Sequence, residues 1–435
     1  VARAAGVVAS VAILVKLVAT VKEFAVAGLY GRSDAMDAFL AASLVPALLV
    51  NLISESMNQA LIPTLVRVRA QQGLARAQQL LSGSMLWTCL LLTAASLAMA
   101  AAAPWFFPLI ASNFAADKLH LSVRLFYGVL PTVLFAGVAA NCVAVLNTTG
   151  KFAAPALAPA AIPLAILAVT PLLRAQLGIW ALAVSTVVGT LLYAALSARL
   201  MHSSGYKFHL AWSGPNEATR EVARQYGPVL LSSVVASGGL LVDQAMAAML
   251  PAGSVSALVY ANRFVSVTLT LLAGAVSSAV TPAFSELVAA QDWRECRRMF
   301  THWLALMAAV SIPIAAALIL GAHWLIRLTF QHGAFHAADT AVVTPVLAMY
   351  ALQIPFFACS RVPYRLIVAM RRTDLVFYCG LINLALDIAL NLVLMRRFGV
   401  AGIALATSLW TASTFLFLTF WARRLLRSRL AESPQ

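Results

Sequence analysis

The sequence VAILVKLVATVKEFAVAGLYGRSDAMDAFLAASLVPALLVNLISESMNQALIPT, residues 11–64, decides how the chain folds. It contains two apolar segments that are each long enough to cross a bilayer, since a spanning helix needs ~20 mostly apolar residues. Five charged residues interrupt these segments: Lys16, Lys22, Glu23, Asp37 and Glu55. A charge at bilayer depth costs roughly 2.5–3.5 kcal/mol on insertion scales, so it usually faces a bundle interior or a water-filled path. The stretch therefore predicts membrane helices around a polar site.

The composition of the whole chain indicates a polytopic membrane protein. Of its 435 residues, 62% are hydrophobic and 10% are charged, whereas a soluble domain contains ~25% charged residues. The formal net charge of +15 comes from basic residues in short loops between apolar segments. This distribution is typical of membrane orientation rather than of nucleic-acid binding. The five cysteines have no metal-site or CxxC spacing, so we expect no metal ion.

Hydropathy predicts an all-α protein with about twelve transmembrane helices. They cover residues 4–30, 35–66, 80–111, 122–146, 152–173, 177–200, 224–250, 254–287, 300–327, 338–368, 374–395 and 399–422. Most of the loop arginines and lysines then lie on the side of the N-terminus and of the basic C-terminal tail. Since basic loops stay in the cytoplasm, we expect both termini there.

An internal repeat divides the chain into two halves. Residues 178–183 (GIWALA) recur as residues 402–407 (GIALAT), and Pro131 recurs as Pro355 at the same offset. We predict an N-terminal six-helix lobe, a cytoplasmic linker, a C-terminal six-helix lobe and a cytoplasmic tail, over residues 1–201, 202–223, 224–425 and 426–435. Two parallel halves with a binding site at their interface are an architecture of transporters.

Several polar residues lie at helical spacing inside the later apolar segments. They are Asp243, Arg263, Arg361, Arg365, Asn383, Asp387 and Asn391. The last three are spaced at i, i+4 and i+8, so they form one stripe on a helix. Each of these residues either makes a structural bond between helices or serves transport. Arg361 and Arg365 are also placed to extend toward the lipid headgroups, and Glu23 is placed to neutralise Lys16.

Three cations in the predicted bundle favour an anionic substrate. Lys16, Lys22 and Arg263 outnumber the acids near them in the predicted bundle. Arginine offers a planar fork and lysine a point charge, and both suit phosphate or pyrophosphate. The sequence has no Walker loop, nucleophile elbow or HExxH motif, so we expect no enzymatic activity and no cofactor. Energy would then come from a coupling ion (H⁺ or Na⁺), the membrane potential or substrate flux.

The first helices resemble the MurJ (MviN) lipid II flippases of the multidrug/oligosaccharidyl-lipid/polysaccharide (MOP) exporter superfamily. The resemblance rests on KEFAVAGLYG at residues 22–31, Asp37-Ala38-Phe39, Glu55, Asn58-Gln59-Ala60 and Pro63, and on residues 253–263 with GSVS and YANR. It implies two lobes that form a V around a central cationic cavity, and alternating access in the bacterial inner membrane. The family's helix-one and helix-eight cavity arginines fall on Lys16, Lys22 and Arg263.

The resemblance also shows two departures. A pair of family arginines in the second helix falls on Val50 and Asn51. The family has fourteen helices, and its last two form a groove for the lipid tail, whereas we count twelve here.

The resulting hypothesis is a monomeric flippase for a polyprenyl-pyrophosphate-linked glycan among membrane lipids, with lipid II as the preferred substrate. Lys16, Lys22 and Arg263 would hold the pyrophosphate, and Asp37, Glu55 and Gln59 would contact the sugars or gate the cavity. Coupling or gating would fall to Glu23, Asp243, Asp387, Asn383 and Asn391. The alternatives are another lipid-linked oligosaccharide, a cation-coupled drug exporter of the same superfamily, and a non-transporting scaffold whose buried charges are all paired.

Overall fold

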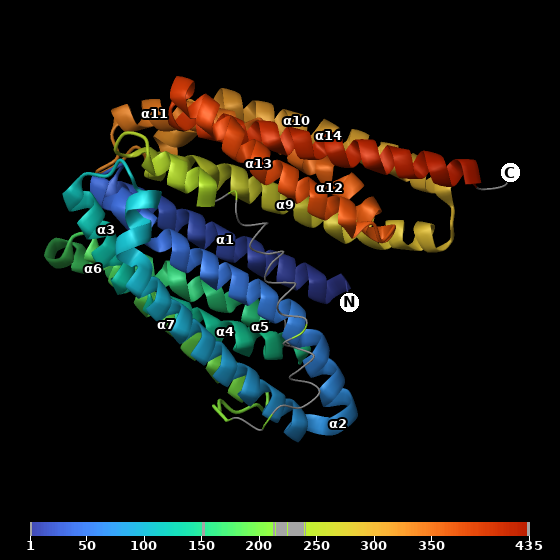
Figure 1. Cartoon of the computed structure of the whole chain (residues 1–435), viewed down its shortest axis with the longest axis horizontal. Coiled ribbons are helices and arrows are strands. Elements are labelled where there is room, and N and C mark those ends of the chain that lie inside the picture. Colours follow the sequence, from blue (N-terminus) through green and yellow to red (C-terminus); the bar gives the residue numbers. More distant parts are fainter. Residues whose placement is uncertain are drawn as a thin grey trace. The chain divides into compact units, whose positions relative to one another are not determined.

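The computed structural model describes residues 2–149, 153–211 and 241–432, together with the single positions 214, 224 and 239. In these ranges the secondary structure consists of helices, and no strand occurs. The described residues form two compact units. Unit 1 comprises residues 2–211 with 251–253, and unit 2 comprises residues 241–250 with 254–432. Unit 1 includes the helices coloured from blue to green in Figure 1, and unit 2 includes those coloured from yellow-green to red.

Unit 1 is a bundle built around a long second helix. Its elements are α1 (Ala2–Tyr30), α2 (Asp34–Ile110), α3 (Ala116–Val129), α4 (Pro131–Thr148), α5 (Ala153–Leu157), the 3₁₀ turn η1 (Ala158–Ala160), α6 (Ala161–Leu177) and α7 (Trp180–His202). Helix α2 packs against α3 and α4, α7 packs against α4 and α6, and α1 packs against α5 and α6. The side chain of Ser33 caps α2 by accepting a hydrogen bond from the Met36 amide, 3.3 Å away.

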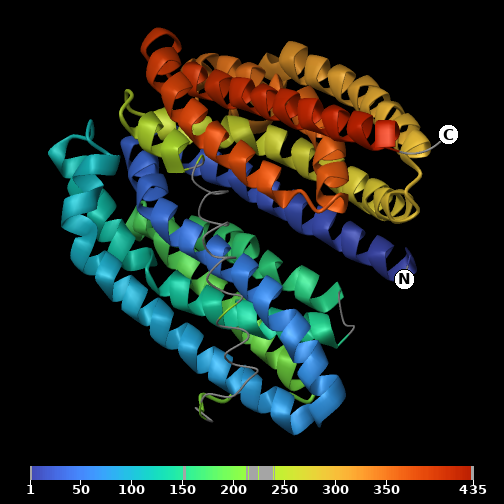
Figure 2. The ribbon, with the colours of Figure 1, turned by 45° about the vertical axis from the view of Figure 1, so that its right-hand side comes forward.

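Helix α2 contains two of the predicted membrane segments, residues 35–66 and 80–111. The chain turns back at Gly73, whose φ of +80° is open to glycine, so the two arms of α2 run antiparallel (Figure 2). Leu61 and Leu65 of the first arm share a buried cluster with Leu80 and Leu81 of the second. Hydropathy predicts a loop between these segments. Apart from Gly73, however, the chain stays helical, because this stretch consists mainly of good helix formers.

Unit 2 has six named helices. They are α9 (Ser254–Ala289), α10 (Trp293–Phe330), α11 (Ala337–Ala351), α12 (Gln353–Ala369), α13 (Thr373–Phe398) and α14 (Val400–Glu432), and residues 241–248 are also helical. Helix α12 packs against α9, α10 and α14. Residues of all of these helices except α11 form one buried cluster that includes Phe284, Phe300, Leu366 and Leu418.

The two units share helix interruptions, and the structure corrects the register of the predicted repeat. The apolar spans Ala116–Thr148 and Ala337–Ala369 each have 33 residues and are each interrupted near the middle, close to Pro131 and Pro355. Proline lacks the amide donor that a continuous helix needs. Gly178 ends α6 with φ +56°, and Gly399 ends α13 with the same φ. The counterpart of Gly178 is therefore Gly399 and not Gly402, which lies inside α14.

Nine helices among the described residues are long and apolar enough to cross a membrane. They are Leu61–Ile110, Ala116–Thr148, Ala153–Leu177, Trp180–His202, Ser254–Ala289, Trp293–Phe330, Ala337–Ala369, Thr373–Phe398 and Val400–Ala431. The predicted all-α, multi-pass class is confirmed. The count of twelve stays a prediction, as do the lobe boundaries, because the linker 202–223 and the helix 224–250 lie largely outside the described residues.

Candidate functional site

The predicted cations of the first helix lie in different surroundings within unit 1. The Lys22 ammonium lies 2.7 Å from Oε1 of Glu23, and the Lys22 side chain is 19% exposed. Glu23 itself is buried. Lys16 is exposed, and its carbonyl accepts a hydrogen bond from the Thr20 hydroxyl. Lys22 therefore already has a carboxylate partner next to it in the chain.

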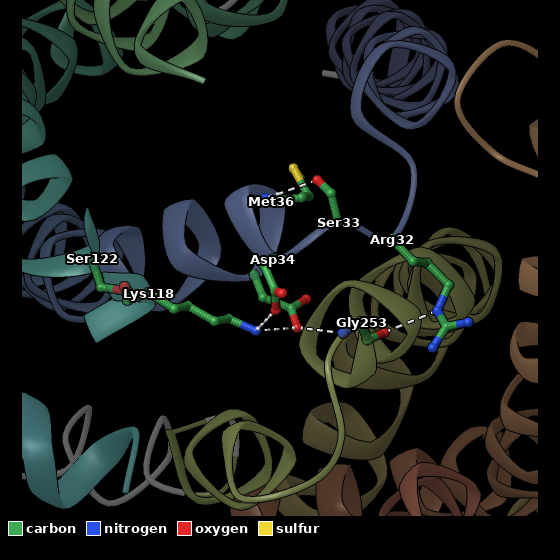
Figure 3. A network of polar contacts seen from close by, with 8 residues as sticks. Arg32, Ser33, Asp34, Met36, Lys118, Ser122 and Gly253 are labelled. Atoms are coloured by element: carbon green, nitrogen blue, oxygen red, sulfur yellow. Dashed lines mark hydrogen bonds and ion pairs between the residues drawn. The ribbon is translucent and has the colours of Figure 1, made fainter. Parts of the chain in front are cut away.

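Asp37 is the centre of a polar network near the start of α2 (Figure 3). Lys118 of α3 extends toward α2, and its ammonium lies 2.6 Å from Oδ1 of Asp34 and 3.1 Å from Oδ2 of Asp37. The same Oδ2 atom accepts a hydrogen bond from the amide of Gly253 at 2.6 Å. Asp37 is 1% exposed. A buried carboxylate is thereby neutralised by a cation and an amide, as its burial requires.

The turn at residues 251–253 is held on both sides. While its amide donates to Asp37, the carbonyl of Gly253 accepts a hydrogen bond from Nε of Arg32 at 3.0 Å (Figure 3). Gly253 has φ +81°, and a Cβ there would lie 2.9 Å from the Arg32 carbonyl oxygen. Only glycine fits this turn, which immediately precedes α9 in the chain. The geometry suits the gating alternative for Asp37, and direct contact of Asp37 with sugars stays a prediction.

Three predicted substrate contacts lie elsewhere. The side chains of Glu55 and Gln59 lie outside the described part of the structure, although their backbone belongs to α2. Arg263 is on α9 in unit 2, one turn after Tyr260, which is fully buried. Its carbonyl accepts a hydrogen bond from the Ser266 hydroxyl. Lys16 and Lys22 belong to unit 1 and Arg263 to unit 2, so their convergence on one cavity stays a prediction.

Two predicted acids and one predicted amide come together inside unit 2. Nδ2 of Asn391 donates to Oδ1 of Asp243 at 2.8 Å and to Oδ1 of Asp387 at 3.0 Å. The hydroxyl of Thr407 on α14 donates to the second oxygen of Asp243 at 2.9 Å. Asp243 and Asp387 are 6% and 1% exposed, and Oδ2 of Asp387 makes no hydrogen bond among the described residues. This group of four residues is called the carboxylate cluster below.

The carboxylate cluster offers several acceptor oxygens, and no basic side chain among the described residues forms an ion pair with its two carboxylates. Neither Asp243 nor Asp387 forms an ion pair with a basic residue within the ranges that the structure describes. Two carboxylates bridged by one amide repel each other unless a proton or a cation joins them. Carboxylate and hydroxyl oxygens are suitable ligands for a hard cation. The arrangement can therefore hold a proton or a small cation.

Asn383 lies one turn before Asp387 on α13 but makes a different contact. Its Nδ2 donates to the Thr414 hydroxyl on α14 at 2.8 Å and to Sγ of Cys379 at 3.6 Å. This is a polar bond between neighbouring helices, the structural alternative considered for this residue. A coupling or gating role for Asn383 stays a prediction.

Sequence reasoning did not identify two partners of the predicted residues. Lys118 lies between two predicted helices and Thr407 lies in the repeated stretch 402–407, and neither is among the predicted site residues. Lys118 follows Asp117 close to the start of α3, where a lysine is unremarkable. Threonine in an apolar helix usually bonds its own backbone, and Thr407 does so as well, to the carbonyl of Ile403. Their roles depend on helix packing, which the sequence pattern does not contain.

Comparison with known proteins assigns the family. Residues 26–432 match the sequence profile of the family described as Lipid II flippase MurJ. The chain belongs to the MurJ lipid II flippase family. A probable lipid II flippase MurJ of Bdellovibrio bacteriovorus is 25% identical over 413 residues, which cover 93% of this chain and 78% of that protein.

Solved structures show the same fold. A structure of "Lipid II flippase MurJ, inward closed conformation" matches with a TM-score of 0.81 and 22% identity, over 96% of this chain and 87% of that one. An inward-facing MATE family multidrug resistance transporter of the MOP superfamily matches with a TM-score of 0.84 and 11% identity, over 99% of this chain and 100% of that one. The MurJ fold of this chain is thus the MOP-type transporter fold that the sequence predicted.

Proposed function

We propose that this MurJ family member moves lipid II from the cytoplasmic to the periplasmic leaflet of the bacterial inner membrane. The observation that carries the proposal is the match to the MurJ family over residues 26–432. The multi-pass helical fold supports it, because a translocated headgroup needs a path through the bilayer. The substrate is a polyprenyl-pyrophosphate-linked glycan, and the chain acts as a monomer with both termini in the cytoplasm.

In this proposal the pyrophosphate is held by Lys16, Lys22 and Arg263. The two lysines supply point charges, while Arg263 supplies a planar fork with donors for two phosphate oxygens. Binding separates Lys22 from Glu23, or retains Glu23 as part of the site. Asp37, Glu55 and Gln59 contact the sugars or gate the cavity while the lipid tail stays in the bilayer.

The deciding experiment is complementation of a strain depleted of its own lipid II flippase. We expect the wild-type chain to restore growth and Arg263→Ala to fail at matched membrane abundance. Arg327→Ala is the matched control, because Arg327 is an exposed arginine in the same unit that stacks over the Trp324 ring. If wild type and Arg327→Ala restore growth and Arg263→Ala does not, the result supports the proposed role of Arg263 in binding the pyrophosphate. Equal growth with all three refutes it, and failure of the wild type would point to another lipid-linked oligosaccharide.

We further propose that the carboxylate cluster binds the coupling ion. Asp243 and Asp387 lie close together, and no basic side chain pairs with them among the described residues. Bound Na⁺ should raise the thermal unfolding midpoint of the purified chain, whereas choline should not. Asp387→Asn should abolish the Na⁺ effect, and Asp374→Asn, an exposed acid on the same helix, should retain it. A midpoint that depends on pH and not on Na⁺ would identify the proton, and dependence on neither would reject the ion site.

A further inference from the structure

One oxygen of the carboxylate cluster differs from the others. Oδ1 of Asp387 accepts a hydrogen bond from Asn391 at 3.0 Å, whereas Oδ2 is buried and makes no hydrogen bond among the described residues. Both oxygens of Asp243 accept, one from Asn391 and one from Thr407. A buried carboxylate oxygen without a donor is costly. Oδ2 of Asp387 is therefore the atom of the cluster that is best placed to take a ligand.

Gly239 faces this oxygen. A Cβ atom on Gly239 would lie 3.4 Å from Oδ2 of Asp387, and among the described residues no other side chain or helix would come within 4 Å of it. Gly239 precedes Asp243 by four residues, and its backbone is helical, as is that of residues 241–248. Residues at i and i+4 are neighbours on a helix surface. Two turns therefore face each other, with Asp243 opposite Asn391 and Gly239 opposite Asp387.

Packing against the described residues does not require a glycine at position 239. The distance of 3.4 Å is an ordinary van der Waals separation, so an alanine methyl group would fit beside Asp387. Gly189 of α7 is different, because a Cβ there would lie 2.8 Å from the Cα atom of Ile162. Alanine is also the better helix former, since glycine loses more backbone entropy on folding. Gly239 therefore weakens its helix for a reason that close packing does not supply.

The missing side chain leaves room beside the unpartnered oxygen. A bound cation is coordinated by several oxygens, so it needs space for its own volume and for further ligands such as water. The size of the cavity and the number of ligands decide which cation such a site accepts. A methyl group at position 239 would take part of this space while the polar side chains of the cluster stay in place.

We propose that Gly239 makes the room in which the carboxylate cluster takes its cation, so that this position sets the size of the ion. The inference rests on the proposed role of the cluster as the site of the coupling ion. The ligand is a cation of the size of Na⁺, held at the carboxylate oxygens of Asp243 and Asp387. Gly239 makes no bond to the ion and acts as a specificity-determining residue.

The test measures the thermal unfolding midpoint of the purified full-length chain in Na⁺, in the smaller Li⁺ and in choline at equal ionic strength. Both metal cations should raise the wild-type midpoint, Na⁺ by about 3 °C at saturation. Gly239→Ala should lose most of the Na⁺ shift and keep most of the Li⁺ shift. Its midpoint in choline should equal or exceed that of the wild type, because alanine favours the helix.

Gly321→Ala is the matched control. Gly321 lies within α10 of the same unit, and a Cβ there would have no neighbour within 4 Å. This variant should gain the same helix preference and keep both cation shifts. A second variant, Asp387→Glu, fills the same room from the other side, because its carboxylate extends one methylene further. It should show the same selective loss of the Na⁺ shift, and it replaces Gly239→Ala if that variant unfolds below the wild-type midpoint in choline.

The outcomes separate this inference from the proposed ion site. Selective loss of the Na⁺ shift in Gly239→Ala, but not in Gly321→Ala, supports the inference. A full Na⁺ shift in Gly239→Ala overturns it and leaves the ion site standing. Equal loss of the Na⁺ and Li⁺ shifts also overturns it, because the methyl group then disturbs the carboxylates themselves. A wild-type chain that responds to neither cation rejects the ion site and the inference together.

Discussion

Units 1 and 2 differ in whether their buried charges have partners of opposite charge. In unit 1, the buried carboxylates of Glu23 and Asp37 lie within ion-pair distance of Lys22 and Lys118. In unit 2, among the described residues, Asp243 and Asp387 have no basic partner. Arg361 likewise has no acidic partner there. A charge without a partner is costly in a membrane protein and usually marks an ion or substrate site. The difference is therefore one of pairing: the buried carboxylates Glu23 and Asp37 of unit 1 have ammonium partners, whereas Asp243 and Asp387 of unit 2 are placed to take a proton or a cation.

The largest loss of stability is expected when the buried ion pair between Lys118 and Asp37 in unit 1 is broken. Lys118→Met leaves the buried Asp37 carboxylate without its ammonium partner. Loss of one member of a buried pair costs about 3 kcal/mol of unfolding free energy. Denaturant unfolding of the purified chain in detergent measures this cost. Lys207→Met is the control, because Lys207 is exposed and bonds to Gln78 through its backbone amide and carbonyl.

A double variant distinguishes charge from packing in this network. Adding Asp37→Asn to Lys118→Met removes the stranded carboxylate and should restore part of the lost stability. If the two substitutions simply add, the ion pair contributes nothing and unit 1 is not stabilised in the way that we infer.

A smaller loss is expected for the pair in α1. Lys22→Met removes the ammonium 2.7 Å from the buried Glu23 carboxylate, but the Lys22 side chain is partly exposed. We expect a loss of about 1 to 2 kcal/mol, since exposure reduces the value of an ion pair. Lys22→Arg keeps the charge and should lose less. The same unfolding measurement checks both variants, and equal losses would show that packing rather than charge matters at this position.

In unit 2, removing a buried charge should raise the free energy of unfolding instead of lowering it. Asp387→Asn removes one of two neighbouring carboxylates while its remaining amide oxygen can still accept from Asn391. Relief of like-charge repulsion should stabilise the chain by about 1 kcal/mol in choline buffer without Na⁺. Unfolding in that buffer measures the change. A loss of stability similar to that of Lys118→Met would mean that the two units treat their charges alike.

The sequence was sufficient to predict most of the fold and part of the candidate site. The apolar segments follow from composition. The interruptions near Pro131 and Pro355 lie inside the segments 122–146 and 338–368, which were predicted as continuous helices. The meeting of Asp243, Asp387 and Asn391 agrees with the rule that polar residues in apolar helices face inward. Such residues are conspicuous in a chain that is only 10% charged.

The sequence pattern could not predict that α2 continues between its two arms, or which distant residues contact Asp37. The polar stretch between the two arms of α2 resembles a loop by hydropathy but is helical by propensity, and tertiary packing decided between them. Asp37 was singled out, whereas Lys118 and Gly253, which bind it, come from distant parts of the chain. Their pairing is a property of the packed bundle. Local spacing carries no information about it.

The smallest effect is expected for Arg361, and it sharpens the comparison most. Arg361→Gln leaves no carboxylate stranded among the described residues, so in detergent without phospholipid the unfolding free energy should change by less than about 0.5 kcal/mol. Arg424→Gln replaces an exposed arginine of α14, so its unfolding free energy should change as little, and it is the control. A large loss without lipid would mean that Arg361 supports the fold of unit 2 directly, as Lys118 does in unit 1.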